Sequence, residues 1–181
     1  MCGIVGYVGH NENVLHVLID GLKKLEYRGY DSAGLAYVKN KKVIVKKEIG
    51  RVSNLEKVID YSIKTNIGIA HTRWATHGKV TKTNSHPHVQ GDIVLVHNGI
   101  IENYLELKED LKLKGYKFIS QTDTEVLAAF IDYYMKKNKE DIFKIIKEKI
   151  IGSYAIIFIN KEEHEKLYVT KKDSPLLIGK E

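Results

Sequence analysis

The chain opens with the stretch Met1-Cys2-Gly3-Ile4-Val5-Gly6-Tyr7-Val8, in which one cysteine stands directly before an apolar run. Residues 3–8 form a short apolar stretch with β-branched side chains, which predicts a strand. Initiator methionine is removed efficiently before a small side chain, so we expect Cys2 to become the first residue, with a free α-amine. Such an amine has a pKa near ~7.7–8.0, so part of it is neutral at cellular pH. It can act as general base for its own thiol, which makes Cys2 a candidate nucleophile. The alternative is a small buried hydrophobe.

Further apolar stretches outward from this strand predict an alternation of strand groups and helices. Strands are expected at 33–38, 43–46, 67–70, 93–96, 154–159, 167–169 and 176–178. Helices are expected at 12–26, 102–114, 123–137 and 139–150. The strands arrive in groups with helices between them. That order favours layered sheets flanked by helices over a simple parallel, doubly wound sheet.

Composition indicates a single globular domain. The chain has 181 residues, of which 43% are hydrophobic and 29% charged. We find no signal peptide and no apolar run near the ~18 residues of a membrane span, so the expected compartment is the cytoplasm. A single cysteine excludes an intrachain disulfide and a cysteine-based zinc site. The net charge is +6, yet lysines alternate with acids, as in residues 136–141. This pattern describes solvated helix faces, so nucleic acid is not an expected partner.

The segment Leu25-Glu26-Tyr27-Arg28-Gly29-Tyr30-Asp31-Ser32-Ala33-Gly34 has two interpretations. In the first, a helix ends at Gly29 and the chain turns into a strand. The second gives Arg28 a task, because the chain has only three arginines against a background of lysine. A planar cation with several donors could order the surroundings of the nucleophile.

The segment His71-Thr72-Arg73-Trp74-Ala75-Thr76-His77-Gly78 holds the only tryptophan and another of the three arginines. Trp74 could simply fill a core at the end of a strand. Alternatively, Arg73 binds a substrate carboxylate through a paired, charge-assisted hydrogen bond worth ~1.5–3 kcal/mol. Thr76 and His77 would then add polar contacts, and Trp74 would lie on a lid that ends at Gly78.

Two shorter motifs remain undecided from the residues alone. Asn98-Gly99 follows an apolar run, which is typical of a hairpin turn. The same pair could instead stabilise an oxyanion, where one donor is worth ~2.7–4 kcal/mol. Thr122 and Glu125 form a capping box that fully explains a helix start. Asp123, between them, could also bind a substrate ammonium group.

Five of the eight histidines lie close together, which raises the question of a metal hydrolase. They are His71, His77, His86, His88 and His97. Asp92 is the only acid within that span, so carboxylates at ligand spacing are missing. We therefore expect no metal and no cofactor.

Together, these segments resemble the glutamine domain of class II glutamine amidotransferases, which are N-terminal-nucleophile hydrolases. More narrowly, residues 25–34, 71–78 and 97–103 resemble the members that aminate fructose 6-phosphate. Related enzymes of purine or asparagine synthesis share the opening cysteine and the Asn-Gly pair, but they usually have other residues in place of the Tyr-Arg-Gly-Tyr and Arg-Trp-Ala-Thr-His motifs. The likeness covers essentially the whole chain with its motifs in the family's order, and that co-occurrence is far more specific than any single motif.

The resemblance implies an α+β fold, a four-layer α/β/β/α sandwich of two antiparallel sheets. It implies that Cys2 attacks the glutamine side-chain amide to form a thioester, giving glutamate and ammonia, and that Asn98 and Gly99 form the oxyanion hole. Arg73, Thr76 and His77 would hold the α-carboxylate, Asp123 the α-ammonium, and Trp74 would lie on the closing loop. In the family, the ammonia converts fructose 6-phosphate to glucosamine 6-phosphate.

The resemblance also predicts the domain organisation. Residues 1–181 would be the glutamine amidotransferase domain, incomplete at its C-terminal end, with the sugar isomerase domain absent. A sugar-phosphate isomerase half is expected in the full-length protein or in a partner chain, and a homodimer is one option for the full-length form. The alternative from another class is a non-catalytic domain that senses a ligand or binds a partner.

Overall fold

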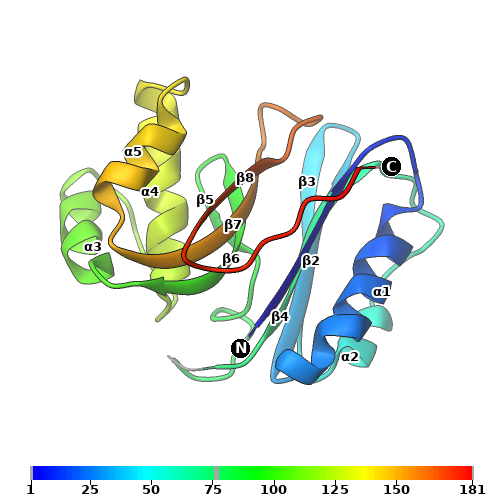
Figure 1. Ribbon diagram of the computed structural model, residues 1–181. Helices are drawn as coiled ribbons and strands as arrows, with labels where there is room; N and C mark the ends of the chain where they lie inside the picture. The colour runs from blue at the N-terminus through cyan, green and yellow to red at the C-terminus, as the bar shows by residue number, and fades with distance from the viewer. Residues whose placement is uncertain (1, 76–77, 181) are drawn as a thin grey trace.

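Two antiparallel sheets of four strands each form the centre of the molecule (Figure 1). The computed structural model describes residues 2–75 and 78–180. The first sheet has the order β1 (Gly3–Val8), β4 (Ile67–Arg73), β2 (Ser32–Lys39), β3 (Lys42–Ile49). The second has the order β5 (His88–Gln90), β6 (Ile93–Ile101), β7 (Gly152–Asn160), β8 (Tyr168–Lys172).

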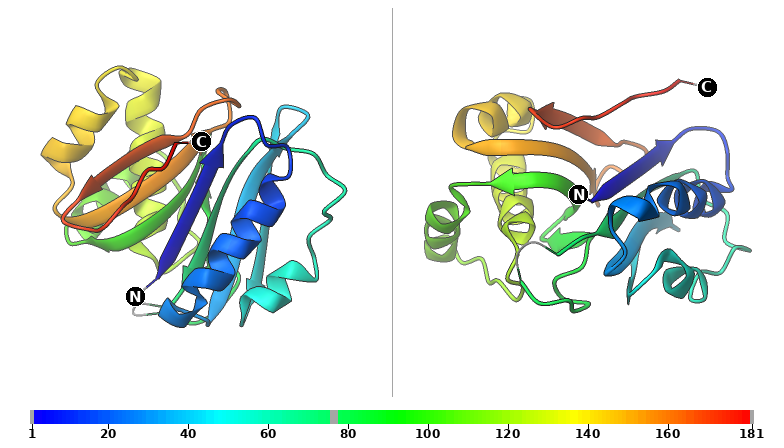
Figure 2. Two further views of the ribbon diagram at one scale, coloured as in Figure 1. Left: turned by 45° about the vertical axis from the view of Figure 1, so that its right-hand side comes forward. Right: turned by 60° about the horizontal axis from the view of Figure 1, so that its bottom comes forward.

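Helices cover the outer face of each sheet. On the first sheet lie α1 (Val14–Leu25), followed by the short 3-10 helix η1 (Glu26–Arg28), and α2 (Val52–Glu56). On the second lie α3 (Tyr104–Leu113), α4 (Asp123–Lys137) and α5 (Ile142–Lys149). Figure 2 shows the two sheets between these helical layers. The α+β, α/β/β/α architecture is therefore confirmed. No helix in the described part of the chain is long and apolar enough to cross a membrane.

Strand β6 shows how the layers are built. Its side chains alternate between the two faces of the sheet, as the period of two requires. Val94 and Val96 pack between the sheets, whereas Ile93 and Leu95 pack against the helical layer. The core between the sheets consists of Ala36, Ile69, Val94, Val96, Ile157 and Ile159, all buried.

The structure corrects several sequence-based boundaries. The strand predicted at 176–178 is wrong: the backbone there forms no ladder, and Leu177 is 97% exposed. The short elements α2 and β5 were not predicted. Strand β6 runs five residues beyond the predicted end, to Ile101, because β7 pairs with it along its full length. An apolar run becomes a strand only where a partner satisfies its backbone.

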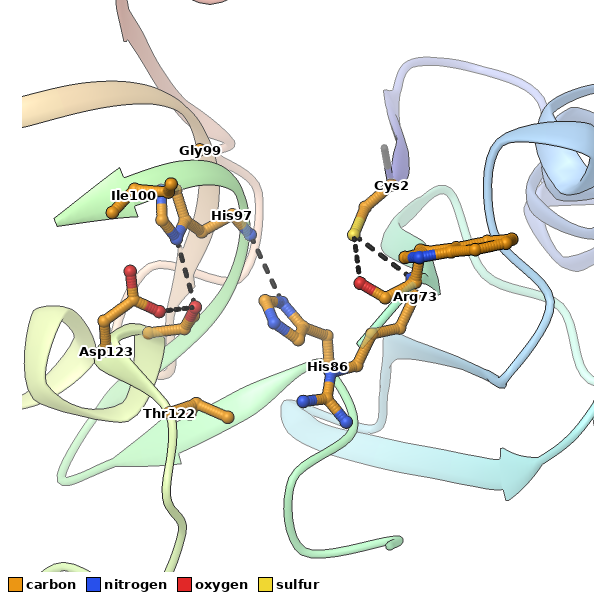
Figure 3. A pocket seen from close by; sticks show the side chains of 10 residues that line it. Cys2, Arg73, His86, His97, Gly99, Ile100, Thr122 and Asp123 are labelled. Carbon is orange, nitrogen blue, oxygen red and sulfur yellow. Dashed lines mark hydrogen bonds between the residues drawn. The ribbon is translucent and has the colours of Figure 1, made fainter. Parts of the chain in front are cut away.

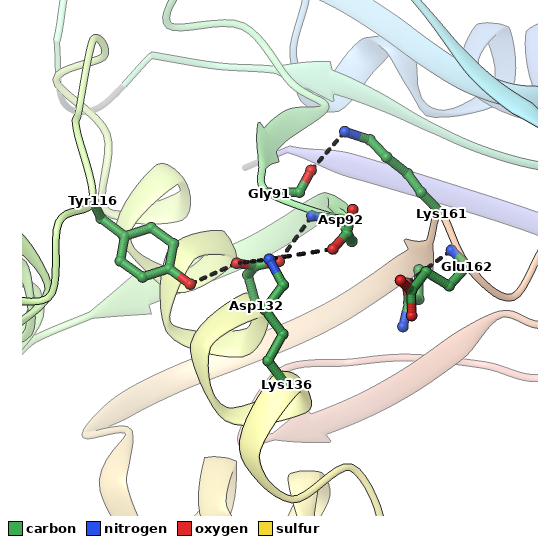
Figure 4. A network of polar contacts seen from close by, with 8 residues as sticks. Gly91, Asp92, Tyr116, Asp132, Lys136, Lys161 and Glu162 are labelled. Carbon is green, nitrogen blue, oxygen red and sulfur yellow. Dashed lines mark hydrogen bonds and ion pairs between the residues drawn. The ribbon is translucent and has the colours of Figure 1, made fainter.

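A buried carboxylate fixes the orientation of α4 (Figure 4). Asp132 is 2% exposed and accepts hydrogen bonds from the Asp92 N–H at 2.8 Å and the Tyr116 hydroxyl at 2.5 Å. Lys136 Nζ lies 2.9 Å from the same carboxylate and 3.2 Å from that of Asp92. These bonds tie the middle of α4 to the turn between β5 and β6, while the helix N-terminus points to the site described next.

Candidate functional site

Cys2 lies directly before β1, where three polar contacts hold it. The Trp74 N–H donates to Cys2 Sγ at 3.3 Å, and the thiol lies 3.7 Å from the Trp74 carbonyl (Figure 3). Asn98 Nδ2 donates to the Cys2 carbonyl at 2.8 Å. Burial raises the pKa of the thiol above its ordinary value, against the lowering effects of the Trp74 N–H and Arg73. A raised pKa keeps the resting group a thiol, so attack requires a base.

A pocket beside the thiol lies between the two halves of the sandwich. Its empty volume is about 450 Å³, including space open to solvent. Cys2 and Arg73 come from the first sheet, while Asp123 stands across from them at the start of α4 (Figure 3). The full lining is Cys2, Arg73, Trp74, His86, His97, Gly99, Ile100, Thr122, Asp123 and Thr124. One wall thus offers a cation and a thiol, and the opposite wall a carboxylate.

Arg73 ends β4 and is only 5% exposed. Its Nη1 donates to the Lys79 carbonyl at 3.3 Å, which closes the loop after β4. Trp74 follows at the mouth of the pocket, 45% exposed, with its ring edge-on to Tyr30 at a centroid distance of 5.3 Å. Trp74 therefore does not fill a core. Thr76 and His77 lie outside the described residues, so their roles stay predictions.

Asp123 is the first residue of α4, where the helix dipole favours a negative charge. Its carboxylate accepts from the Ile101 N–H at 2.9 Å and from the Thr124 hydroxyl at 3.3 Å. Thr122 caps the helix by accepting from the Glu125 N–H, as predicted. The Glu125 carboxylate, however, binds the N–H groups of residues 119 and 120 rather than completing the capping box. Asp123 is thus fixed in the pocket, while Thr122 caps the helix in its place.

Asn98 and Gly99 do not form a hairpin turn. They lie within β6, paired with Ala155 and Tyr154 of β7. Gly99 has φ +134°, and a Cβ there would stand 2.0 Å from the Ser153 carbonyl, so only glycine fits. This conformation places Gly99 in the pocket wall and the Asn98 amide against Cys2. The hairpin interpretation is wrong, and the oxyanion interpretation stays a prediction.

Four of the five clustered histidines form a buried group at the pocket: His71, His86, His88 and His97. Of these, His86 and His97 line the pocket. The rings of His71 and His86 stack at 3.8 Å. Burial lowers the pKa of all four, that of His71 to about 3, so the rings are neutral at pH 7. Within residues 2–75 and 78–180, no group of three or more His, Cys, Asp or Glu side chains could hold a metal ion.

These histidines connect both walls of the site. His71 Nε2 donates to the His97 carbonyl at 3.2 Å, since a carbonyl can only accept. The Thr124 hydroxyl gives its hydrogen to Asp123, so its oxygen accepts from His97 Nδ1 at 3.0 Å. His97 thereby orients Asp123 through Thr124. The sequence marked His86 and His97 by their clustering but gave no role, and it gave no signal for Thr124.

The chain is similar to known proteins in both sequence and fold. The family of "Glutamine amidotransferase domain" sequences matches residues 71–180, more than half of the chain. Glutamine–fructose-6-phosphate aminotransferase [isomerizing] of Clostridium tetani is 52% identical over 182 residues, covering 99% of this chain and 30% of that protein. The enzyme of the same name from Pyrococcus horikoshii is 48% identical over 184 residues, 99% of this chain and 31% of that protein. The chain thus spans about 30% of the length of these relatives.

Among solved structures, the glutamine phosphoribosylpyrophosphate amidotransferase from B. subtilis, complexed with ADP and GMP, superposes with a TM-score of 0.74. It is 28% identical, and the match covers 89% of this chain and 35% of that one. A glutamine aminotransferase class-II domain protein from Silicibacter pomeroyi matches with a TM-score of 0.60 over 98% of this chain and 79% of that one. At 12% identity, this second likeness concerns the fold alone.

Proposed function

The chain belongs to the family of glutamine amidotransferase domains, and we propose that it hydrolyses the side-chain amide of glutamine with Cys2 as nucleophile. One observation carries the proposal: the Cys2 thiol borders a pocket that has Arg73 on its own wall and Asp123 on the other. Free glutamine carries an α-carboxylate and an α-ammonium group, so it needs one cation and one anion placed apart. The pocket supplies both beside a thiol.

Glutamine would bind by its two charges. Arg73 forms a charge-assisted pair with the α-carboxylate, and the Asp123 carboxylate receives the α-ammonium group. Because Asp123 is held by a backbone N–H and by Thr124, it is oriented before the substrate arrives. Thr76 and His77 add carboxylate contacts in this proposal, and Trp74 closes over the bound ligand. Binding the charged end leaves the uncharged amide end for the thiol.

The chemistry begins once Met1 is removed. The free α-amine of Cys2 takes the thiol proton, and Sγ attacks the amide carbon of glutamine. The oxygen that becomes negative receives hydrogen bonds from Asn98 Nδ2 and the Gly99 N–H. The proton then passes to the leaving nitrogen, the C–N bond breaks, and ammonia departs, leaving a thioester. Water attacks the thioester, which frees glutamate and restores the thiol.

The contact between Asn98 and Cys2 supports the proposed role of Asn98 as an oxyanion donor. Its Nδ2 donates to the carbonyl of the nucleophilic residue itself. A primary amide has two N–H hydrogens, so one can keep the Cys2 carbonyl while the other meets the oxyanion. A donor anchored in this way loses little entropy when the negative charge develops.

For the longer protein, we propose the activity that the names of the relatives state. Residues 1–181 act as the glutaminase domain, and the ammonia aminates fructose 6-phosphate to give glucosamine 6-phosphate in the cytoplasm. A sugar-phosphate isomerase half, in the same polypeptide or in a partner chain, binds that acceptor, and a homodimer is one option for the full-length form. The likeness of about half the residues to two such enzymes supports this proposal.

Two measurements on one sample test the glutaminase proposal. Intact mass should show that the chain begins at Cys2, and a coupled assay should show glutamate formed from glutamine. The matched control is Cys2→Ser, which keeps the α-amine and the shape but replaces the thiol, and it should be inactive. A processed, folded chain that binds glutamine without hydrolysing it would instead be a ligand-sensing module.

A further inference from the structure

Two consecutive peptide groups stand between the Cys2 thiol and Asp31. The first joins Arg73 to Trp74: its N–H, from Trp74, donates to Cys2 Sγ at 3.3 Å, and its carbonyl, from Arg73, accepts from the Asp31 N–H at 3.1 Å. The second joins Trp74 to Ala75: its carbonyl lies 3.7 Å from the thiol, and its N–H donates to the Asp31 carboxylate. Each peptide has one polar end on the thiol and the other on Asp31.

This arrangement follows from peptide geometry. In a trans peptide the C=O and N–H point in opposite directions and lie in one rigid plane. Fixing one end of the plane therefore fixes the direction of the other end. Asp31 fixes the first peptide with its main chain and the second with its side chain, so both polar ends that meet the thiol depend on it.

Asp31 is itself held firmly. Its carbonyl accepts from the Gly50 N–H at 2.7 Å, and its carboxylate accepts from the Ser32 hydroxyl at 3.0 Å. Two residues earlier, a Cβ on Gly29 would stand 2.7 Å from the Arg73 carbonyl carbon. The backbone of this segment thus lies directly against the loop after β4. Gly29 is the C-cap of η1, as the first interpretation predicts, and the close approach adds a second reason for a glycine there.

We infer that Asp31 is a positioning residue, which holds the two peptides on either side of Trp74 in the orientation in which they contact the nucleophile. The inference rests on the proposed function, in which Cys2 is the nucleophile. Asp31 lies outside the residues that line the pocket, and its hydrogen bonds reach the thiol only through the loop.

Asp31 has two opposed effects on the thiol. Through the first peptide, it keeps the Trp74 N–H on sulfur, and that hydrogen bond lowers the thiol pKa. Its negative charge acts through space and raises the same pKa. Substitution separates the charge from the side-chain contact: asparagine keeps a side-chain oxygen for the Ala75 N–H but removes the charge, whereas alanine removes both. The main-chain bond from the residue 31 N–H to the Arg73 carbonyl stays in either variant.

The experiment compares Asp31→Asn and Asp31→Ala, with Asp20→Asn on the exposed face of α1 as the control for loss of a remote charge. Three quantities are measured: the pH profile of Cys2 alkylation by iodoacetamide, the hydrogen exchange of the Ala75 amide, and kcat and KM for glutamine. For Asp31→Asn we expect the alkylation profile to shift to lower pH, the Ala75 amide to stay protected, and kcat to remain close to that of wild type.

For Asp31→Ala we expect the Ala75 amide to exchange rapidly and kcat to fall at least about ten-fold, with KM changed much less. Equal loss of kcat in both variants would overturn the inference, because it would assign the effect to charge alone. If Asp31→Ala does not fold, the result for Asp31→Asn decides. The positioning role is refuted if the alkylation profile of Asp31→Asn stays unchanged or moves to higher pH, or if its Ala75 amide loses protection from exchange. Cys2 alkylation and Ala75 hydrogen exchange test the role of Asp31 even if the wild-type chain does not hydrolyse glutamine, so failure of the inference and failure of the proposed function can be distinguished.

Discussion

A single alanine inserted between Met1 and Cys2 gives the sharpest test of the proposed mechanism. Methionine removal still occurs, but the former α-amine of Cys2 becomes a peptide N–H without basicity. The nucleophile itself should stay in place. Strand β1 is held by six registered pairs with β4, from Gly3↔Thr72 to Val8↔Ile67, and the insertion precedes all of them. Asn98 and Trp74 can therefore keep their contacts with Cys2.

The expected loss follows from the buried thiol. An ordinary cysteine has a pKa of about 8.5, so about 3% of it is thiolate at pH 7. Burial raises the pKa of Cys2 further, and less thiolate is present without a base. General-base assistance is worth roughly 10²–10⁴-fold, or about 2.7–5.4 kcal/mol at 1.36 kcal/mol for each factor of ten. We expect kcat for glutamine to fall within that range while glutamine binding survives.

The assay is steady-state release of glutamate, with alkylation of Cys2 by a reactive glutamine analogue as a second readout. The matched control is a chain whose extra leader can be cut off by a protease to leave Cys2 first. One preparation, assayed before and after cleavage, should pass from inactive to active. Near-normal turnover in the uncut or alanine-bearing chain would place the base elsewhere, and the mechanism proposed for Cys2 would be wrong.

Three further substitutions test the substrate pocket, the strand conformation and the anchoring of α4. Arg73→Lys keeps the charge but loses the paired donors, so KM for glutamine should rise about 10-fold or more in steady-state kinetics, and an unchanged KM would remove Arg73 as the carboxylate anchor. Gly99→Ala places a Cβ 2.0 Å from the Ser153 carbonyl, and its free energy of unfolding in urea should drop by more than ~2 kcal/mol; a wild-type midpoint would contradict the strained φ. Asp132→Ala leaves the Asp92 N–H and Tyr116 hydroxyl without their acceptor, so stability should fall by ~2–4 kcal/mol while KM stays unchanged; a KM change without destabilisation would refute a purely structural role.

The sequence predicted elements best where local pattern and tertiary pairing agree. Strand β1 and helix α4 begin and end at the predicted residues, since each carries its own periodicity and a clear boundary. The sequence leaves the structure of Asn98-Gly99 undecided, because a hairpin turn and a strand with a positive φ both favour glycine. Only the pairing with β7 shows that the two residues lie in a strand. The run at 176–178 misled because apolar residues fail to form a strand without a partner in the sheet.

The candidate site shows a similar division. Cys2, Arg73, Trp74 and Asp123 could be singled out from residue type and motif, and they line one pocket. The residues that orient them could not be singled out. Asp31 acts through the backbone of a loop that it contacts 44 positions later in the chain. Thr124 acts by accepting a hydrogen bond from His97 and donating one to Asp123. Such roles depend on distances between segments that no local pattern encodes.

The placement of the pocket between the two sheets has a consequence for substrate selection. On the proposed roles, the thiol and the carboxylate anchor belong to the first sheet, and the ammonium anchor with the oxyanion donors belongs to the second sheet and its helix. The distance between the walls is then set by side chains that never meet the ligand, such as Ile69 and Ile157 in the layer between the sheets. Shrinking one of them would alter which chain length of amino-acid amide can reach sulfur while both its charges stay bound. Discrimination between glutamine and its one-carbon-shorter homologue would thus be a property of the hydrophobic core.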